Sequence, residues 1–210
     1  MKVLQILPQL NIGGVERGTL DLSKALIHKG HESFVISGGG ILVDELEQLG
    51  AKHYEIPVHI KSLRTLSLAK SLSETISSID PDIVHIRSRM PAWVNYRAFK
   101  MLQKKPLLVS TFHGLYSFPI YSKVMSFVDH SIAISKTVER YILENYKLDK
   151  GDITVIPRGC DPLEFNNEVI NPVDKANIIE EFPQIVGKKV LTIPGRITKW
   201  KGVAEFIDLL

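Results

Sequence analysis

The pattern of apolar and polar positions alternates along the chain between short apolar runs and longer helical stripes. Runs rich in Val, Ile and Leu are typical of buried strands, and segments with apolar residues every three or four positions are typical of helices. The runs predict strands at residues 3–7, 33–37, 53–56, 83–86, 107–112, 130–134 and 153–156. The stripes predict helices at residues 16–29, 41–49, 63–79 and 92–104, and from a cap at residue 135 to about 146.

This strand-helix alternation predicts an α/β fold with a doubly wound parallel sheet, since parallel neighbours need a helical crossover. The pattern weakens after residue 165, so we expect a Rossmann-like N-terminal domain over residues 1–165 and a linker region over 166–187. Residues 188–210 then predict the first strand and helix of a truncated second domain. A chain of 210 residues is short for two complete domains of this kind.

Polar and glycine residues follow five of the predicted strands, at the points where those strands end. They lie at residues 11–16, 85–89, 111–114, 135–136 and 157–161. Ligands of open parallel sheets bind outside the carboxyl ends of the strands. The sequence therefore predicts a binding site at this edge of the sheet.

A second glycine-rich turn follows the apolar run at residues 190–193. It contains Gly195, Arg196, Lys201 and Gly202, and a helix begins nearby. Backbone amides and a helix N-terminus attract an anion, and two cations beside them neutralise it. Cations at a helix start oppose the helix dipole unless an anion is bound, which favours a diphosphate site over ordinary surface charges.

Taken in order, five motifs resemble the signature of glycosyltransferase family 4, within the GT-B fold of two facing Rossmann-like domains. They are Gly13-Gly14-x-Glu16, Asp82-Ile83-Val84-His85, Thr111-x-His113-Gly114, Ile156-Pro157-x-Gly159-x-Asp161 with Phe165, and Gly195-Arg196 with Lys201-Gly202. The resemblance covers the whole chain but reaches only the first motif of the donor-binding domain. The run from His85 to Trp93 further resembles bacterial enzymes that build lipopolysaccharide or other surface glycans.

The resemblance implies a retaining, hexosyltransferase-like enzyme that moves a sugar from a nucleotide-sugar donor to an acceptor hydroxyl. It implies a glycan or lipid-linked acceptor, and neither a cofactor nor a metal ion. Arg196 and Lys201 would hold the diphosphate leaving group, where charge develops in the transition state. His113 would lie near the transferred sugar as the third catalytic residue.

The remaining site residues implied by the resemblance bind donor or acceptor. Gly13 and Gly14 would let the backbone approach the donor phosphates and the acceptor, and Glu16 would order that loop or contact the acceptor. Arg158 and Asp161 would line the hinge side of the cleft, and Arg87 or Arg89 would face an anionic acceptor. Purely structural interpretations of these residues stay open. The glycine pair would then be a turn only, both arginines would be solvated surface charges, and His85 would be a hydrogen-bonded core residue.

One departure from the family pattern leads to two functional hypotheses. The two family glutamates that grip the donor, eight positions apart, lie downstream of the matched region. We therefore expect a transferase that is active only with the rest of the donor domain, such as a separately encoded C-terminal half. The alternative is a non-catalytic remnant or interaction module from a split or interrupted gene. An epimerase of the same fold is a third hypothesis, which the Gly195-Arg196 motif disfavours.

Two further sequence features have competing interpretations. Asp80-Pro81-Asp82 imitates a metal-binding Asp-x-Asp motif, but it precedes a strand at the opposite edge from the ligands, so we expect no metal there. The aromatic segment at residues 116–127, which includes Lys123, could contact a membrane or pack under the cleft, and we expect packing.

Composition and charge narrow the expected partners and compartment. A net charge of +3 without a basic patch predicts no nucleic-acid partner. Cys160 is the only cysteine, which excludes an internal disulfide and suits a reducing compartment. The first apolar run is too short for a signal peptide, and no stretch is long enough to span a bilayer. We expect a cytoplasmic protein with at most peripheral contact at the inner face of the membrane.

Overall fold

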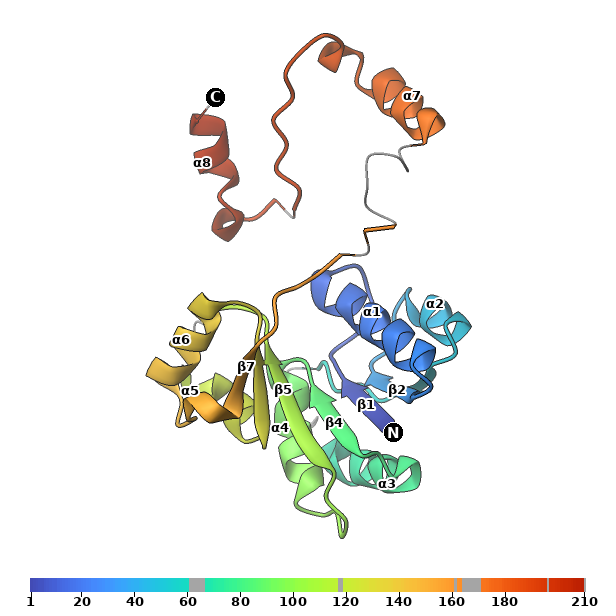
Figure 1. The fold of residues 1–210 in the computed structure, drawn as a ribbon, viewed down its shortest axis with the longest axis vertical. Coiled ribbons are helices and arrows are strands. Elements are labelled where there is room, and N and C mark those ends of the chain that lie inside the picture. Colours follow the sequence, from blue (N-terminus) through green and yellow to red (C-terminus); the bar gives the residue numbers. More distant parts are fainter. Residues whose placement is uncertain (61–66, 117–118, 161, 164–170, 196, 210) are drawn as a thin grey trace. The chain divides into compact units, whose positions relative to one another are not determined.

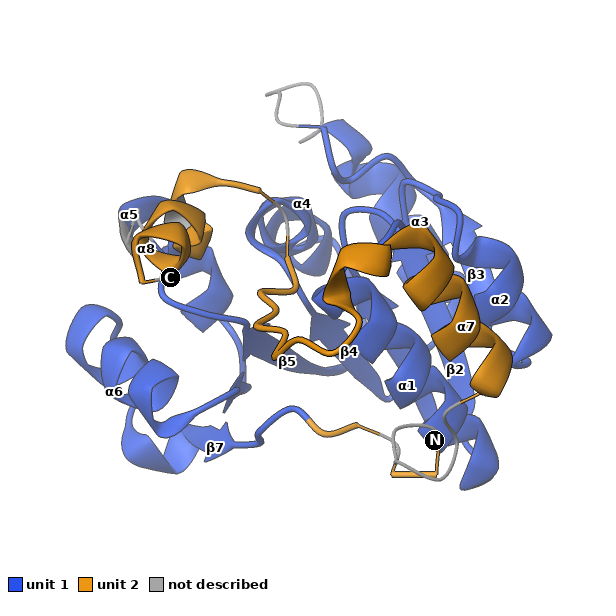
Figure 2. Ribbon diagram, turned by 90° about the horizontal axis from the view of Figure 1, so that it is seen from above, with its two compact units in different colours: residues 1–158 blue, residues 159–210 orange. Residues whose placement is uncertain are grey.

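The computed structural model describes residues 1–60, 67–116, 119–160, 162–163, 171–195 and 197–209. The chain divides into two compact units, Met1–Arg158 and Gly159–Leu210, coloured separately in Figure 2. Each unit is described by itself.

The first unit is built on a seven-stranded sheet with the order β3-β2-β1-β4-β5-β6-β7 (Figure 1). All six neighbouring pairs are parallel. The strands are β1 (Lys2–Ile6), β2 (Glu32–Ser37), β3 (Lys52–Glu55), β4 (Ile83–Ile86), β5 (Leu107–Phe112), β6 (His130–Ala133) and β7 (Ile153–Val155). The predicted doubly wound parallel α/β fold is confirmed, and each strand lies within two residues of its predicted bounds.

The crossovers between these strands contain helices α1 (Gly14–His28), α2 (Val43–Gln48), α3 (Ala69–Ile79), α4 (Arg89–Phe99), α5 (Pro119–Ser122) and α6 (Lys136–Asn145). Their ends follow from local chemistry. The Ser135 side chain accepts a hydrogen bond from the Val138 amide and caps α6, as expected of serine at that position. Gly30 follows α1 with φ at 76°, a left-handed conformation that glycine adopts without steric cost.

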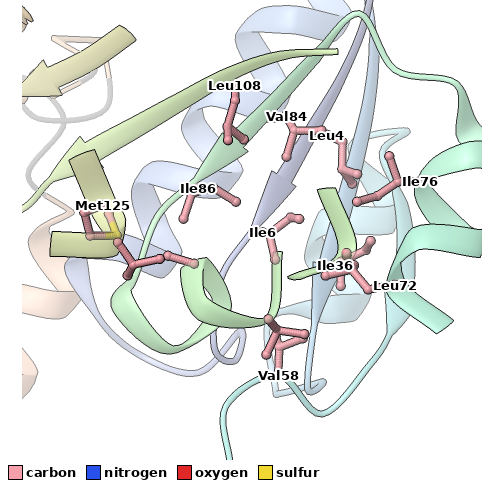
Figure 3. Close-up of a cluster of buried hydrophobic side chains, with 14 of the residues drawn as sticks. Leu4, Ile6, Ile36, Val58, Leu72, Ile76, Val84, Ile86, Leu108 and Met125 are labelled. Carbon is pink, nitrogen blue, oxygen red and sulfur yellow. The ribbon is translucent and has the colours of Figure 1, made fainter. Parts of the chain in front are cut away.

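Side-chain alternation along β1 places the core on both faces of the sheet. Leu4 and Ile6 are fully buried in one cluster with Leu72 and Ile76 of α3 (Figure 3). Gln5, between them, faces α1 on the other side, where its side chain bonds to that helix. Helices thus cover both faces of the sheet, and the ends of the strands lie outside this packing.

The second unit contains helix α7 (Pro172–Glu181), a 3-10 turn η6 (Lys199–Lys201) and helix α8 (Val203–Asp208). Helix α7 falls in the weakly patterned segment, where no helix was predicted. Its start has a local cause: the Asn171 side chain accepts a hydrogen bond from the Val173 amide, and Pro172 occupies the first turn.

The apolar run at residues 190–193 differs from the sequence expectation. It was predicted as the first strand of a second domain, but it has no strand pairing in the structure. A strand exists only beside another strand, and the described residues of this unit contain none. Val190 and Leu191 are consequently more than half exposed. The helix expected from near Lys201 is present as α8.

Candidate functional site

The site is built at the carboxyl edge of the sheet, where β1 and β4 are neighbours. The chain leaves β1 toward one face of the sheet and β4 toward the other, which makes this pair the switch point of the fold. The loop after β1 leads to Gly13 and Gly14, and Arg87 follows β4 directly. Arg158, at the end of the segment after β7, donates a hydrogen bond to the carbonyl oxygen of Gly14.

The Gly13-Gly14 loop is shaped by a side chain of the helix that follows it. The φ of Gly13 is 173°, an extended conformation open to any residue, so backbone freedom is not the reason for this glycine. A Cβ at residue 13 would overlap the Glu16 carboxylate, which lies against the first turn of α1. Negative charge at a helix N-terminus is stabilising. Gly13 therefore provides room for the Glu16 carboxylate at the start of α1.

Arg87 is a buried cation with an incomplete set of partners. Its side chain is only 5% exposed, and Nη1 donates to Gln5 Oε1 at 3.0 Å. Gln5 is held in turn by donating to the Thr19 carbonyl oxygen at 3.2 Å. The buried Nε of Arg87 has no hydrogen-bond partner. Burial, followed by the charge of Arg158, lowers the pKa of Arg87 to about 10, so it stays protonated at neutral pH.

His113 follows β5 and lies in the electric field of both arginines. Both of its ring nitrogens are buried without a hydrogen-bond partner. Burial, then the charges of Arg87 and Arg158, lower the pKa of His113 to about 3. The imidazole is therefore neutral at physiological pH, with one N–H to donate and one lone pair to accept.

His85 and Arg89 have different surroundings from their neighbours in sequence. His85 is buried and its Nε2 lies 2.7 Å from Thr111 Oγ1, and burial places its pKa well below the usual value. This is the hydrogen-bonded core histidine of the alternative interpretation. The Arg89 guanidinium stacks over the Tyr116 ring at 4.8 Å and the Tyr121 ring at 5.4 Å. Arg89 thus packs with the aromatic segment, and Arg87 alone of the pair lies beside Gly18 of α1.

The aromatic segment itself packs against α4, as expected. The Trp93 indole N–H donates to the Tyr121 carbonyl oxygen at 3.0 Å, and Tyr96 stacks with Phe127 at 5.2 Å. Ile120, in contrast, is 89% exposed. No helix in the described part of the chain is long and apolar enough to cross a membrane.

Three predicted site residues belong to the second unit or lie outside the described residues. Arg196 and Asp161 lie outside the described residues. Lys201 is exposed at the end of η6 in the second unit. The roles proposed for these three residues remain predictions.

The acidic residues that imitate a metal motif are engaged elsewhere. Asp80 forms an ion pair with Lys104 at 2.7 Å, and Asp82 accepts a hydrogen bond from the Lys2 amide at 2.7 Å. Within the residues that the structure describes, no three His, Cys, Asp or Glu side chains gather as a metal site would require.

Two residues of the site were missed by the sequence analysis. Gln5 is a polar residue inside an apolar strand, and it positions Arg87. Gly18 lies inside α1, where glycine is unfavourable by about 1 kcal/mol relative to alanine. A polar residue within an apolar strand and a glycine within a helix both depart from the local pattern, so both could have been identified from the sequence.

A doubly wound parallel sheet with polar residues gathered at the switch point defines a Rossmann-like domain with a candidate site at that edge. The chain belongs to glycosyltransferase family 4, whose family model matches residues 12–163.

Relatives agree with this assignment. The chain is 33% identical over 147 residues to an uncharacterized glycosyltransferase of Methanocaldococcus jannaschii, covering 61% of this chain and 36% of that protein. A solved glycosyltransferase from Rickettsia africae is 37% identical, with a TM-score of 0.76 over 96% of this chain and 54% of that one. Anabaena HepE, solved with UDP-glucose, has a TM-score of 0.79 at 19% identity, over 99% of this chain and 56% of that one, and shows the fold alone. The chain thus spans about half or less of the length of these relatives.

Proposed function

We propose that this chain supplies the acceptor-side domain of a retaining glycosyltransferase, which moves a sugar from a nucleotide-sugar donor to an acceptor hydroxyl. One observation carries the proposal: the neutral, unpartnered imidazole of His113 lies in the field of Arg87 and Arg158 at the switch point. Membership of glycosyltransferase family 4 supports it. The binding of UDP-glucose by HepE, a protein of the same fold, supports a nucleotide-sugar as donor.

In this proposal the described residues orient the substrates. His113 donates or accepts a hydrogen bond at a sugar hydroxyl, and Gly14 lets the ligand approach the backbone at the start of α1. Arg196 and Lys201 stabilise the departing diphosphate, which needs no metal ion in this scheme. We propose lipopolysaccharide or another surface glycan as the acceptor class, on the resemblance of residues 85–93 alone.

The second unit bears on a second candidate function, a non-catalytic interaction module. None of its described residues is buried, and Val190, Leu191 and Ile193 expose between 38% and 63% of their surface. An apolar run without strand neighbours is suited to pairing with strands of another polypeptide, such as a separately encoded C-terminal half. This observation is compatible with an enzyme half and with a non-catalytic interaction module.

A transfer assay separates these functions. The purified chain is incubated with radiolabelled nucleotide-sugars and a glycolipid extract, alone and with the C-terminal half of the Rickettsia africae glycosyltransferase. With the C-terminal half present, we expect label to enter the extract with retained anomeric configuration by NMR, and the chain alone should transfer little. His113→Asn should lower the rate at least about tenfold, the effect of losing one hydrogen bond of about 1.4 kcal/mol.

His28→Asn, at an exposed histidine near the end of α1, is the matched control and should leave the rate unchanged. Transfer that His113→Asn does not affect would contradict the assignment of the site. No transfer in either setting would favour the interaction module.

A further inference from the structure

Two guanidinium groups approach the same point on α1, above Gly18. Nη2 of Arg158 lies 2.5 Å, and Nη2 of Arg87 3.2 Å, from the position that a Cβ at residue 18 would occupy. The mutual repulsion of the two cations contributes to the lowered pKa of Arg87. Two like charges held so close are unfavourable unless something compensates them.

In the described part of the chain, no carboxylate compensates the two arginines directly. Among the residues that the structure describes, neither guanidinium forms an ion pair with an acidic side chain. Glu16 and Asp21 attract Arg87 from further away, and the Glu16 carboxylate lies on the Gly13 side of the helix start. The bonds that are made go to neutral acceptors, the Gln5 side chain and the Gly14 carbonyl oxygen.

Gly18 is the feature that makes this arrangement possible. Any side chain at residue 18 would displace the Arg158 guanidinium. Glycine in a helix interior is destabilising relative to alanine, and residue 18 is not in a left-handed conformation that would demand glycine. The space above Gly18 is therefore kept for the two cations.

We propose that Arg87 and Arg158, above Gly18, bind one oxyanion carried by the acceptor, a phosphate or a carboxylate group. The proposal rests on the proposed function and names the class of acceptor as anionic. A planar guanidinium presents paired N–H donors that match such a group, and the buried, unpartnered Nε of Arg87 is one such donor. His113, in the field of the same two arginines, then lies beside the anionic end of the acceptor.

The diphosphate of the donor has the same chemistry as a phosphorylated acceptor, so the test separates the two sources. The ¹⁵N resonances of the arginine side chains are followed by NMR while the 210-residue chain is titrated at constant ionic strength. The probes are glucose 6-phosphate, glucuronate, glucose and UDP. We expect glucose 6-phosphate or glucuronate to shift Arg87 and Arg158 together, glucose to shift neither, and UDP to bind these arginines more weakly.

Two variants and a control test the arrangement rather than the charge. Arg158→Gln, at an exposed residue, should weaken binding of the anionic sugar at least tenfold. Gly18→Ala keeps both arginines and favours the helix, and should weaken binding by moving Arg158, though by less than Arg158→Gln does. Arg140→Gln removes an exposed arginine from α6 and should have no effect.

Equal effects of Arg140→Gln and Arg158→Gln would overturn the proposal, as would full affinity in Gly18→Ala. A shift of both arginines by UDP but not by the anionic sugars would assign the oxyanion to the donor and overturn the acceptor assignment. The titration needs no turnover. Anion binding by a protein that never transfers sugar would therefore support this site and contradict the proposed function. Sugar transfer to neutral acceptors that Gly18→Ala does not affect would support the proposed function and contradict this site.

Discussion

The Arg158 guanidinium donates a hydrogen bond to the carbonyl oxygen of Gly14, which lies 144 positions earlier in the chain. This bond connects the segment after β7, at one edge of the sheet, to the start of α1, which follows the central strand β1. It places Arg158 next to Arg87 and Gly18. The geometry of the candidate site therefore depends on a contact between two distant segments, and on the buried groups beneath it.

Replacing Gln5 should destabilise the fold through Arg87. In Gln5→Leu the buried guanidinium loses the acceptor of its Nη1 bond, and the Ser23 hydroxyl loses a donor at 3.0 Å. An unsatisfied buried polar group costs about 1–3 kcal/mol, more where it is charged, so we expect a loss of at least that size in the free energy of unfolding. Urea denaturation measures it.

The control is the double variant Gln5→Leu with Arg87→Leu, which removes both partners. Its cost should be smaller than the sum of the two single costs, because residues in direct contact are not additive. Additive costs would contradict the coupling of these side chains.

Phe112→Ala should test the core beneath the site. The Phe112 ring is fully buried, with the Tyr116 ring at 5.5 Å and the Tyr146 ring at 5.4 Å. Truncating a buried phenylalanine leaves a cavity and costs about 3–5 kcal/mol. Leu115→Ala, at a leucine that is 61% exposed, should change the free energy of unfolding by less than about 0.5 kcal/mol. Equal midpoints in chemical denaturation for both variants would show that Phe112 is not part of the packed core.

Gly40→Ala should strain the loops at the carboxyl edge. The φ of Gly40 is 140°, and a Cβ there would lie 2.5 Å from the carbonyl carbon of Leu10, a fully buried residue. We expect a loss of about 2 kcal/mol or more, from an unfavourable backbone conformation together with the steric overlap. Gly151→Ala is the matched control, because a Cβ at residue 151 meets open space. Thermal unfolding of the two variants side by side measures the difference, and similar melting temperatures would contradict the tight approach at Gly40.

The stability of the protein should fall at mildly acidic pH because of His113. The unfolded chain binds a proton near pH 6.5, whereas burial and the two arginines hold the pKa of folded His113 at about 3. Between these values the unfolded state binds more protons. The free energy of unfolding therefore falls as the pH falls, by up to about 1.4 kcal/mol per pH unit.

His113→Asn removes this contribution and should flatten the profile of unfolding free energy between pH 6 and pH 4. The buried His85, whose pKa is also lowered by burial, remains in both proteins and contributes the same slope to each. Parallel profiles for the wild type and the variant would mean that His113 is protonated in the folded protein.

The strands and most helices could be predicted because their signals are local. A run such as residues 83–86 is apolar because both faces of a parallel sheet are covered, and the stripe of α3 faces the core cluster with Leu72 and Ile76. Helix α7 was missed because its apolar residues form no clear stripe, although the Asn171-Pro172 start signal was present. The apolar run at 190–193 has strand composition, but pairing is a non-local property that composition does not determine.

For the site, the sequence predicted which strand end each residue follows better than it predicted what surrounds that residue. Arg87, His113 and Arg158 follow the ends of their strands, and the fold brings them together. Arg89 is two positions from Arg87, yet it opens helix α4 and stacks on tyrosines of a distant segment. Where the Arg89 side chain packs depends on tertiary contacts. The role of Gly18 follows only from the positions of the two guanidinium groups above it, which the sequence does not give.

The strand order also has a consequence for how the chain acquires its structure. β1 precedes the other six strands of this sheet in the chain, but it lies between β2 and β4, and its pairing with β4 joins Val3 to Ile83. One edge of β1 therefore stays open until residue 86 has been synthesised. Contacts between residues so far apart in sequence are slow to form, because a long loop must be closed first. Among the six strand pairings, this one at the centre of the sheet, beside the candidate site, thus closes the longest loop of the chain.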